Sequence, residues 1–377
     1  MSVQANVKER YAEGAKEVQA ELCCPVDYDK ELLKILPQEI IEKDYGCGDP
    51  SRYVREGDTV LDLGSGGGKI CYMAAQLVGD KGSVIGVDMT DDMLALAQKY
   101  RDEMADKIGG APVVFHRGHI QDLALNLDAL NHYLNDNPVN TIHDMEVLDA
   151  WKQKQRREEP MIADNSIDLV ISNCVLNLVA ENEKNQLVNE IFRVLKPGGR
   201  VAISDIVSDE DIPVHLKNDA QLWSGCISGA FHEKGFLDTF LAAGFVAVGY
   251  DKWDLQAWQV VEGIEFRSVT LVGTKPQGTD CIDRGHAVIY KGPYQSVIDD
   301  EGHLFPRGER IAVCQRSFDF LLNGPYKDDF IGITPAKLKD PVPLCAPAGT
   351  TRPASETKGG KYDSSTANAS TSGGSCC

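Results

Sequence analysis

The feature that most constrains the fold is a regular alternation of short apolar runs and helical stretches between residues 59 and 204. Apolar runs bounded by turn residues are typical of buried strands, and apolar residues at helical spacing fill the intervals. Strands that alternate with helices predict a mainly parallel sheet covered by helices on both faces. The expected strands span residues 59–63, 83–87, 113–115, 167–172 and 200–204, the expected helices span 70–78, 91–107 and 183–195, and two later strands, near 245–250 and 266–274, are expected to complete the sheet as an antiparallel pair.

The segments around this alternating core differ from it in composition. Residues 1–56 are expected to form an N-terminal helical segment, and residues 57–277 the core domain, which carries a helical insertion at 124–160. Short β-like runs with Gly-rich turns predict a small β-rich C-terminal unit at 278–345. From residue 346 to residue 377 the chain is rich in Ser, Thr, Gly, Ala and Pro, so we expect a disordered tail there.

The charge balance excludes several kinds of partner. Lys and Arg number 38 and Asp and Glu number 57, which gives a formal net charge of −19. Nucleic acids and anionic membranes need a basic face, so neither is an expected partner. The polar N-terminus lacks the apolar stretch of a signal peptide, and no apolar run approaches the ~18 residues of a membrane span. We expect a cytoplasmic location, and a monomer.

A glycine-rich loop follows the first expected strand. Residues 62–68 read Asp-Leu-Gly-Ser-Gly-Gly-Gly, and glycines at such a turn let a ligand approach the backbone closely. The dinucleotide pattern G-x-G-x-x-G fails here because its third position is Lys69, whereas D-x-G-x-G-x-G fits. Asp88 ends the next strand, where an acidic group can hold ribose hydroxyls. The alternatives are a NAD-type domain or an ordinary α/β core with a glycine turn.

The loop resembles the cofactor loop of class I S-adenosylmethionine methyltransferases, whose fold is a Rossmann-like doubly wound sheet. The resemblance is strengthened by Lys196-Pro197-Gly198-Gly199 before the fifth strand. It implies that Asp88 binds the ribose, that residues after the third strand cradle the adenine, and that the end of the fourth strand lies beside the transferring methyl. The implied cofactor-binding residues are Tyr45, Asp62, Gly64, Ser65, Gly66, Gly68, Asp88, Met89, Ile120, Gln121 and Asn173.

The cysteines point to the kind of acceptor. The chain has 11 of them and no secretion signal, so they are expected to be reduced thiols rather than a disulfide framework. Cys174 lies just beyond the fourth strand, Cys226 follows the fifth, and Cys47 lies in a turn just before the core. Methyl transfer to an organic acceptor normally needs only a base. Three soft thiolates near one crevice instead indicate a thiophilic centre.

At these residues the chain resembles arsenite methyltransferases, the enzymes that methylate trivalent arsenic. The matching motifs are Tyr45-Gly46-Cys47-Gly48, the loop at 62–68, Gly86-Val87-Asp88-Met89, Ser172-Asn173-Cys174-Val175-Leu176-Asn177-Leu178, and Cys226 followed by Gly229-Ala230.

The resemblance implies that arsenite and methylarsenite are the substrates and that methyl groups come from S-adenosylmethionine. Cys47, Cys174 and Cys226 would hold As(III) as a trithiolate whose lone pair attacks the methyl group in line. A fourth thiol would pair with Cys47 as electrons are returned. It falls on the Cys23-Cys24 pair, of which we choose Cys24. A thiol reductant, glutathione or thioredoxin, would then restore the enzyme.

Two other functions compete with this one. The first is a methyltransferase for an organic small molecule, such as a quinone or sterol precursor, in which the cysteines are merely packed. The second is a non-catalytic, thiol-based metalloid-binding protein. The remaining cysteines Cys71, Cys281, Cys314 and Cys345 are interpreted as small core residues, and the pair Cys376-Cys377 could chelate arsenic and deliver it.

Overall fold

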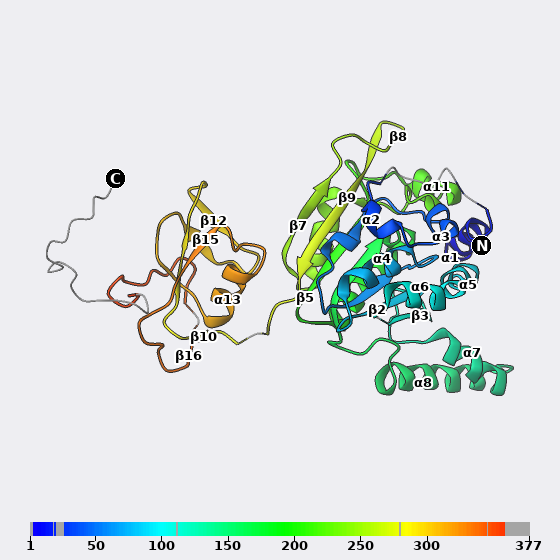
Figure 1. Ribbon diagram of the computed structural model, residues 1–377, viewed down its shortest axis with the longest axis horizontal. Coiled ribbons are helices and arrows are strands. Elements are labelled where there is room, and N and C mark those ends of the chain that lie inside the picture. The colour runs from blue at the N-terminus through cyan, green and yellow to red at the C-terminus, as the bar shows by residue number, and fades with distance from the viewer. Residues whose placement is uncertain are drawn as a thin grey trace. The chain divides into compact units, whose positions relative to one another are not determined.

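The computed structural model describes residues 3–17, 19, 26–110, 112–278, 280–344 and 346–358. The chain divides into two compact units, residues 1–276 and 277–377 (Figure 1). Within the described ranges, no helix is long and apolar enough to cross a lipid bilayer.

The first unit is built on one nine-stranded sheet with the order β3-β2-β1-β4-β5-β9-β7, in which β6 also pairs with β5 and β8 with β9. The pairs from β3 to β5 are parallel, and β9 pairs antiparallel with both β5 and β7. The predicted parallel sheet and its antiparallel pair are therefore confirmed. The strands are β1 (Thr59–Leu63), β2 (Ser83–Asp88), β3 (Val113–Arg117), β4 (Ile167–Asn173), β5 (Leu195–Ser208), β6 (Phe231–His232), β7 (Val246–Trp253), β8 (Gln259–Val261) and β9 (Ile264–Thr274).

Helices and short 3₁₀ turns connect these strands, and their bounds follow in chain order. They are α1 (Val3–Gly14), α2 (Lys30–Leu33), α3 (Gln38–Glu42), η2 (Pro50–Tyr53), α4 (Lys69–Val78), α5 (Asp91–Lys99), α6 (Arg101–Ile108), α7 (Leu127–Asp136), α8 (Ile142–Glu158), η3 (Leu176–Leu178), η4 (Glu181–Glu183), α9 (Lys184–Val194), α10 (Val214–Lys217), α11 (Ala220–Ser224) and α12 (Glu233–Ala242).

Alternation along the strands gives the sheet an apolar surface on both faces. In β1, Val60 packs into the cluster that contains α4, whereas Leu61 packs into the cluster that contains α9 and α12. In β4, Leu169 packs into the cluster that contains α4, and Val170 packs into the cluster that contains α9 and α12. Successive strand residues point to opposite faces, so a fully apolar strand requires helices on both sides.

The prediction of a single helix at 91–107 is wrong, because the structure has two helices there. α5 ends at Lys99 and α6 begins at Arg101, with Tyr100 between them at φ −102° and ψ 2°. The Tyr100 hydroxyl donates to Glu39 at 2.6 Å, while Met104 is fully buried. These tertiary contacts redirect the chain where helical periodicity alone predicts continuation.

The insertion expected at 124–160 contains the two helices α7 and α8, which lie side by side (Figure 1). The rings of Tyr133 and Trp151 stack between them at 4.3 Å. Arg156 in the basic run of α8 binds Asp122 through its guanidinium at 2.7 Å.

The described part of the second unit consists of short strands and one helix around a small core. Its three sheets pair β10 with β16, β14 with β11 and β15, and β12 with β13. Phe305 and Leu321 are among its fully buried side chains. The helix α13 was not expected from the sequence. The elements are β10 (Ile282–Asp283), β11 (Ala287–Tyr290), β12 (Ser296–Ile298), β13 (Leu304–Pro306), β14 (Ile311–Ala312), α13 (Gln315–Asn323), β15 (Phe330–Ile333) and β16 (Val342–Pro343).

The tail predicted at 346–377 begins too early. Residues 346–358 pack on the second unit, where the buried Arg352 donates to Asp283 at 2.8 Å and Thr351 bridges to Ile311. The low apolar content of this stretch led to the error, because its attachment depends on a buried ion pair. Residues 359–377, which include Cys376 and Cys377, lie outside the described part of the chain.

Candidate active site

A cavity opens at the carboxyl ends of the parallel strands, with about 930 Å³ of empty space that includes its opening to solvent. Ligands of open α/β sheets bind at this edge. All the residues predicted to bind the cofactor line it except Gly68, which instead caps the N-terminus of α4. Those that do are Tyr45, Asp62, Gly64, Ser65, Gly66, Asp88, Met89, Ile120, Gln121 and Asn173.

Asp88 closes the glycine loop as well as facing the cavity. One carboxylate oxygen accepts from the Gly66 amide at 2.9 Å, and the other accepts from the Thr90 amide at 2.7 Å. Burial raises the pKa of Asp88, and these amide donors oppose the rise. The side chain therefore holds the loop backbone in place while retaining further acceptor capacity.

Asp62, at the end of β1, is a second buried carboxyl beside the cavity. Burial raises its pKa to about 7, although the Cys71 thiol donates to it at 3.2 Å. The interpretation of Cys71 as a small core residue is thus incomplete, since this buried thiol also supports a cavity residue. With this raised pKa, the Asp62 carboxyl changes protonation close to neutral pH.

The cavity fits a ligand that carries both hydroxyl and ring-nitrogen groups. The Ser65 hydroxyl and the His119 Nδ1 are buried without a hydrogen-bond partner among the described residues, and both residues line the cavity. A Cβ at Gly66 would meet only the Met93 sulfur, at 4.0 Å, so the space beside this loop is open. Orphaned polar groups beside an open glycine backbone are what the nucleoside and amino-acid parts of S-adenosylmethionine require.

Helix α1 covers the cavity, a role that sequence reasoning missed. Val7 and Tyr11 line the space, and the Tyr45 hydroxyl donates to the Gly14 carbonyl at 2.9 Å. Arg10 donates to the Ser224 hydroxyl at 2.7 Å, which ties α1 to α11. The i,i+4 spacing of Val7 and Tyr11 is the one signal in the sequence for an apolar face on this polar helix.

The three predicted thiol ligands converge beside this cavity. Cys47 and Cys174 form a disulfide with a Cα–Cα distance of 5.8 Å, so the expectation of reduced thiols is wrong for this pair. The Cys226 thiol donates to the Cys174 carbonyl at 3.3 Å, and its side chain also hydrogen-bonds Tyr11. All three cysteines belong to one buried apolar cluster. Asn173 and Val175, which flank Cys174, line the cavity, so the thiols lie directly beside it.

Two of these cysteines have an unusual backbone. Cys174 has φ 61° and Cys226 has φ 63°, both in the left-handed region. A side chain other than glycine is uncommon there and costs free energy, and such residues concentrate at functional sites. The surrounding structure therefore holds both thiols in place against a local preference.

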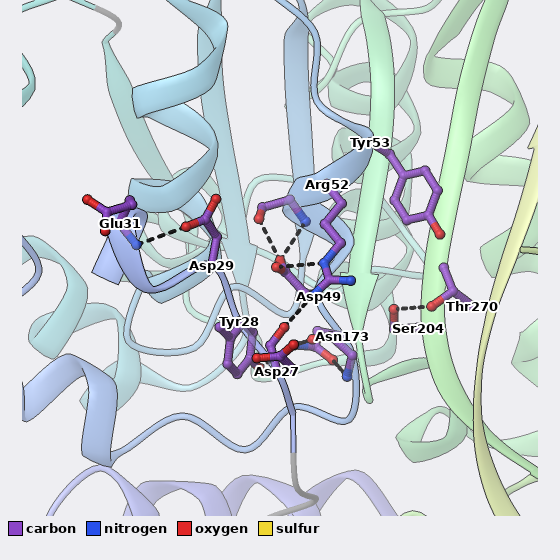
Figure 2. A network of polar contacts seen from close by, with 12 residues as sticks. Asp27, Tyr28, Asp29, Glu31, Asp49, Arg52, Tyr53, Asn173, Ser204 and Thr270 are labelled. Atoms are coloured by element: carbon purple, nitrogen blue, oxygen red, sulfur yellow. Dashed lines mark hydrogen bonds and ion pairs between the residues drawn. The ribbon is translucent and has the colours of Figure 1, made fainter. Parts of the chain in front are cut away.

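Asn173, whose side chain lies near Tyr28 in Figure 2, fastens the turn that carries Cys47 to the end of β4. Its Oδ1 accepts from the amides of Cys47 at 2.9 Å and Gly48 at 3.0 Å, and its Nδ2 donates to the Gly48 carbonyl at 2.8 Å. The same Nδ2 donates to the Tyr28 hydroxyl at 3.1 Å. Sequence reasoning placed Asn173 at the cofactor, whereas its hydrogen bonds also bring Cys47 to Cys174.

The residues on either side of Cys47 are glycines because the turn lies too close to Asn173 and Ser204 to leave room for a side chain. A Cβ at Gly46 would lie 2.0 Å from the Asn173 Nδ2, and a Cβ at Gly48 would lie 2.4 Å from the Ser204 hydroxyl. Any side chain at either position would push the turn away from the sheet. The Gly-Cys-Gly sequence is therefore a packing requirement for the thiol's position.

Comparison with known proteins identifies the family. A methyltransferase-domain model matches residues 55–159 and 152–255. The arsenite methyltransferase of Aquipseudomonas alcaligenes is 30% identical over 334 residues, which cover 84% of this chain and 86% of that protein. The arsenite methyltransferase of Mus musculus is 31% identical over 327 residues, which cover 84% and 77%. The chain belongs to the arsenite methyltransferase family.

A solved structure of this family supports the fold assignment. The arsenic(III) S-adenosylmethionine methyltransferase from Chlamydomonas reinhardtii superposes with a TM-score of 0.55 at 28% identity, and the match covers 82% of this chain and 96% of that one. Residues 277–362 match a model described only as a domain of unknown function. The second unit of this arsenite methyltransferase family member therefore has no role assigned by its family model.

An acidic residue near the thiols was also missed by sequence reasoning. Asp205, in β5, has a carboxylate oxygen within 4.8 Å of the sulfurs of both Cys47 and Cys174. Burial raises its pKa to about 7, against the pull of backbone amides that include Ile206 and Asn177. The only signal in the sequence is an acidic residue within an apolar strand. The predicted fourth thiol, Cys24, and its competitor Cys23 lie outside the described residues.

Proposed function

We propose that this protein transfers methyl groups from S-adenosylmethionine to trivalent arsenic, with arsenite and methylarsenite as substrates. The observation that carries the proposal is the convergence of Cys47, Cys174 and Cys226 beside the cavity at the strand ends. Three soft sulfur donors match a thiophilic centre, and an organic acceptor would have no use for them.

The glycine loop and the strand ends would hold the methyl donor. S-adenosylmethionine supplies an electrophilic methyl group on a sulfonium centre. Asp88 would accept from ribose hydroxyls, and Ser65 and His119 would use the polar atoms that have no partner among the described residues. Gly64 and Gly66 line the cavity and carry no side chain, so they would let the ligand approach the loop backbone closely. Helix α1 would exclude water through Val7 and Tyr11.

The thiols would bind arsenite by exchange of its hydroxyl groups. Three thiols and As(OH)₃ give a trithiolate and three water molecules, with no change in oxidation state. Arsenic keeps its lone pair, so the chain need only orient the bound substrate toward the cavity and needs no general base. The flanking residues Asn173 and Val175 are shared between the thiol site and the cavity, which supports that orientation.

The Cys47–Cys174 disulfide implies a reducing step before arsenite binds. Two equivalents of a thiol such as glutathione, or one dithiol such as thioredoxin, would return the pair to two thiols and become a disulfide. Cys24 is our proposed fourth thiol, which would relay this exchange. A cytoplasmic location would suit the enzyme, since cytosolic thiol pools keep cysteines reduced.

The test is product speciation by chromatography with each substrate offered separately and excess thiol present. Arsenite needs three thiolates, whereas methylarsenite already carries one carbon substituent and needs two. Cys174→Ser and Cys226→Ser should lose methylation of both substrates, because a serine hydroxyl does not replace a soft thiolate. Cys47→Ser and Cys24→Ser should lose arsenite methylation but keep measurable methylation of methylarsenite.

Cys345→Ser is the matched control, at a cysteine to which the proposal gives no role. Arsenite methylation at the wild-type rate by Cys174→Ser would refute the arsenic site. The same result for Cys47→Ser alone would refute the three-ligand form of it.

A further inference from the structure

The second unit contains a pair of thiols that the proposed reaction does not use. Cys281 precedes β10 and Cys314 precedes α13, yet their side chains hydrogen-bond to one another. Neither is in a disulfide. Cys314 is buried, whereas Cys281 is half-buried and therefore open to a ligand from solvent.

The surroundings of Cys314 stabilise its sulfur in the anionic form, whereas burial and the neighbouring Cys314 raise the pKa of Cys281. Cys314 caps α13, and its sulfur accepts from the Ser317 amide at 3.4 Å beside the Ser317 hydroxyl at 3.2 Å. Arg316 lies against Cys281, with 3.8 Å between Nη2 and Sγ, and is held by Glu301 at 2.7 Å. Burial acts to raise the pKa of Cys314, but these hydrogen bonds and the Arg316 charge outweigh burial and lower that pKa.

The number of donors limits the ligand class. Among the described residues, no third His, Cys, Asp or Glu joins these two thiols in a group whose ligand atoms all lie within 4.8 Å. A structural zinc ion takes four such ligands, and the described residues offer two here. Two soft sulfurs match a trivalent arsenical with two exchangeable positions.

We propose that Cys281 and Cys314 form a second arsenical site, which chelates methylarsenous acid and related monosubstituted trivalent arsenicals without methylating them. Two S–H bonds and two As–OH bonds break, two As–S bonds form, and two water molecules leave, so arsenic stays trivalent. This site goes beyond the proposed function, because it lies in a unit that does not contain the cofactor cavity.

The test uses the full-length chain with Cys174→Ser, reduced by a phosphine, so that turnover plays no part. Methylarsenous acid is the probe, and the rate of Cys281 alkylation is followed by peptide mass spectrometry. We expect the probe to slow Cys281 alkylation and to give an arsenic-bridged peptide pair that contains Cys281 and Cys314. Dimethylarsinous acid, which has one exchangeable position, is the control ligand and should give no bridge.

Cys314→Ser is the decisive variant, because serine is a good helix cap and should preserve the fold. Loss of one arm of a chelate should weaken binding at Cys281 at least ~100-fold. Protection of Cys281 at the same probe concentration in Cys314→Ser would overturn the proposal, and so would equal alkylation of the parent with and without the probe. Neither result bears on the proposed methyl transfer, since the assay contains no methyl donor.

Discussion

The buried carboxyl of Asp88 has two roles. Its oxygens accept from the backbone amides that fix the glycine loop, and the same oxygens would accept from the ribose hydroxyls. Asp88→Ala should raise the dissociation constant for S-adenosylmethionine ~10–150-fold, because hydrogen bonds to a charged group contribute ~1.5–3 kcal/mol. Calorimetry with the cofactor measures this. Arsenite affinity in the same variant should change far less, and an unchanged cofactor affinity would remove Asp88 from the site.

Asp62 should make the folded protein less stable as the pH rises. Its pKa is about 7 when folded and near 3.8 ordinarily, so between these values the folded state holds a proton that the unfolded state has lost. Stability therefore falls as pH rises through this window. Asp62→Asn keeps an acceptor for Cys71 and removes the titration. Without cofactor, the free energy of unfolding of Asp62→Asn should exceed that of the wild type by an amount that grows from pH 4 to pH 8. At pH 8 the difference should be on the order of 3 kcal/mol.

Thermal unfolding of both proteins across this pH range provides the measurement. Parallel stability curves for the two would contradict the assignment. Asp205, with a similar pKa of about 7, is present in both proteins and cancels from the difference.

Among elements, the parallel strands were predictable because each is an apolar run with its own turn signals. The bend at Tyr100 was not, since it depends on a contact with Glu39 that is remote in sequence. The covering position of α1 was missed for a similar reason: a mostly polar helix gives few signs of the surface against which it packs. Asp205 illustrates the same limit at the site, because its neighbours Cys47 and Cys174 lie in two loops that are remote from it in sequence.

The turn that carries Cys47 should not tolerate a side chain at Gly48. Gly48→Ala places a Cβ 2.5 Å from the Ser204 Cβ, which would displace Cys47 from Cys174. We expect arsenite methylation to fall at least ~10-fold, in the way that small misplacements of reacting groups reduce rates. Cofactor affinity should persist, because Gly48 does not line the cavity.

Two further variants make this experiment specific. Gly249→Ala, where nothing lies within 4 Å of the added Cβ, should leave the rate unchanged. Gly48→Ala combined with Ser204→Gly removes the clashing atoms and should recover part of the lost rate. A fully active Gly48→Ala single variant would show that the turn can move freely.

For the whole molecule, composition predicted a small C-terminal unit but misplaced its end. The ion pair between Arg352 and Asp283 attaches residues that lack large apolar side chains, and a pairing of this kind leaves no trace in composition. Arg352→Ala should destabilise the second unit by about 3 kcal/mol, because it leaves the Asp283 charge buried without its partner.

Calorimetry, which follows the unfolding of each unit, is the appropriate measurement. The first unit should unfold as in the wild type, because the pair lies wholly in the second. Lys234→Ala, which breaks an exposed pair with Asp238, should cost little in comparison. Equal effects of the two substitutions would mean that residues 346–358 do not brace the second unit.

The left-handed backbone at Cys174 and Cys226 has a consequence for directed evolution of this enzyme. Glycine relieves the strain of that conformation by about 1 kcal/mol per residue. At Cys226, where glycine would break no disulfide, a library screened for heat resistance alone should therefore enrich glycine, and each such variant would have lost a thiol. At Cys174 the same change would also break the bond to Cys47, so heat selection retains that cysteine whereas only a screen that demands turnover retains Cys226.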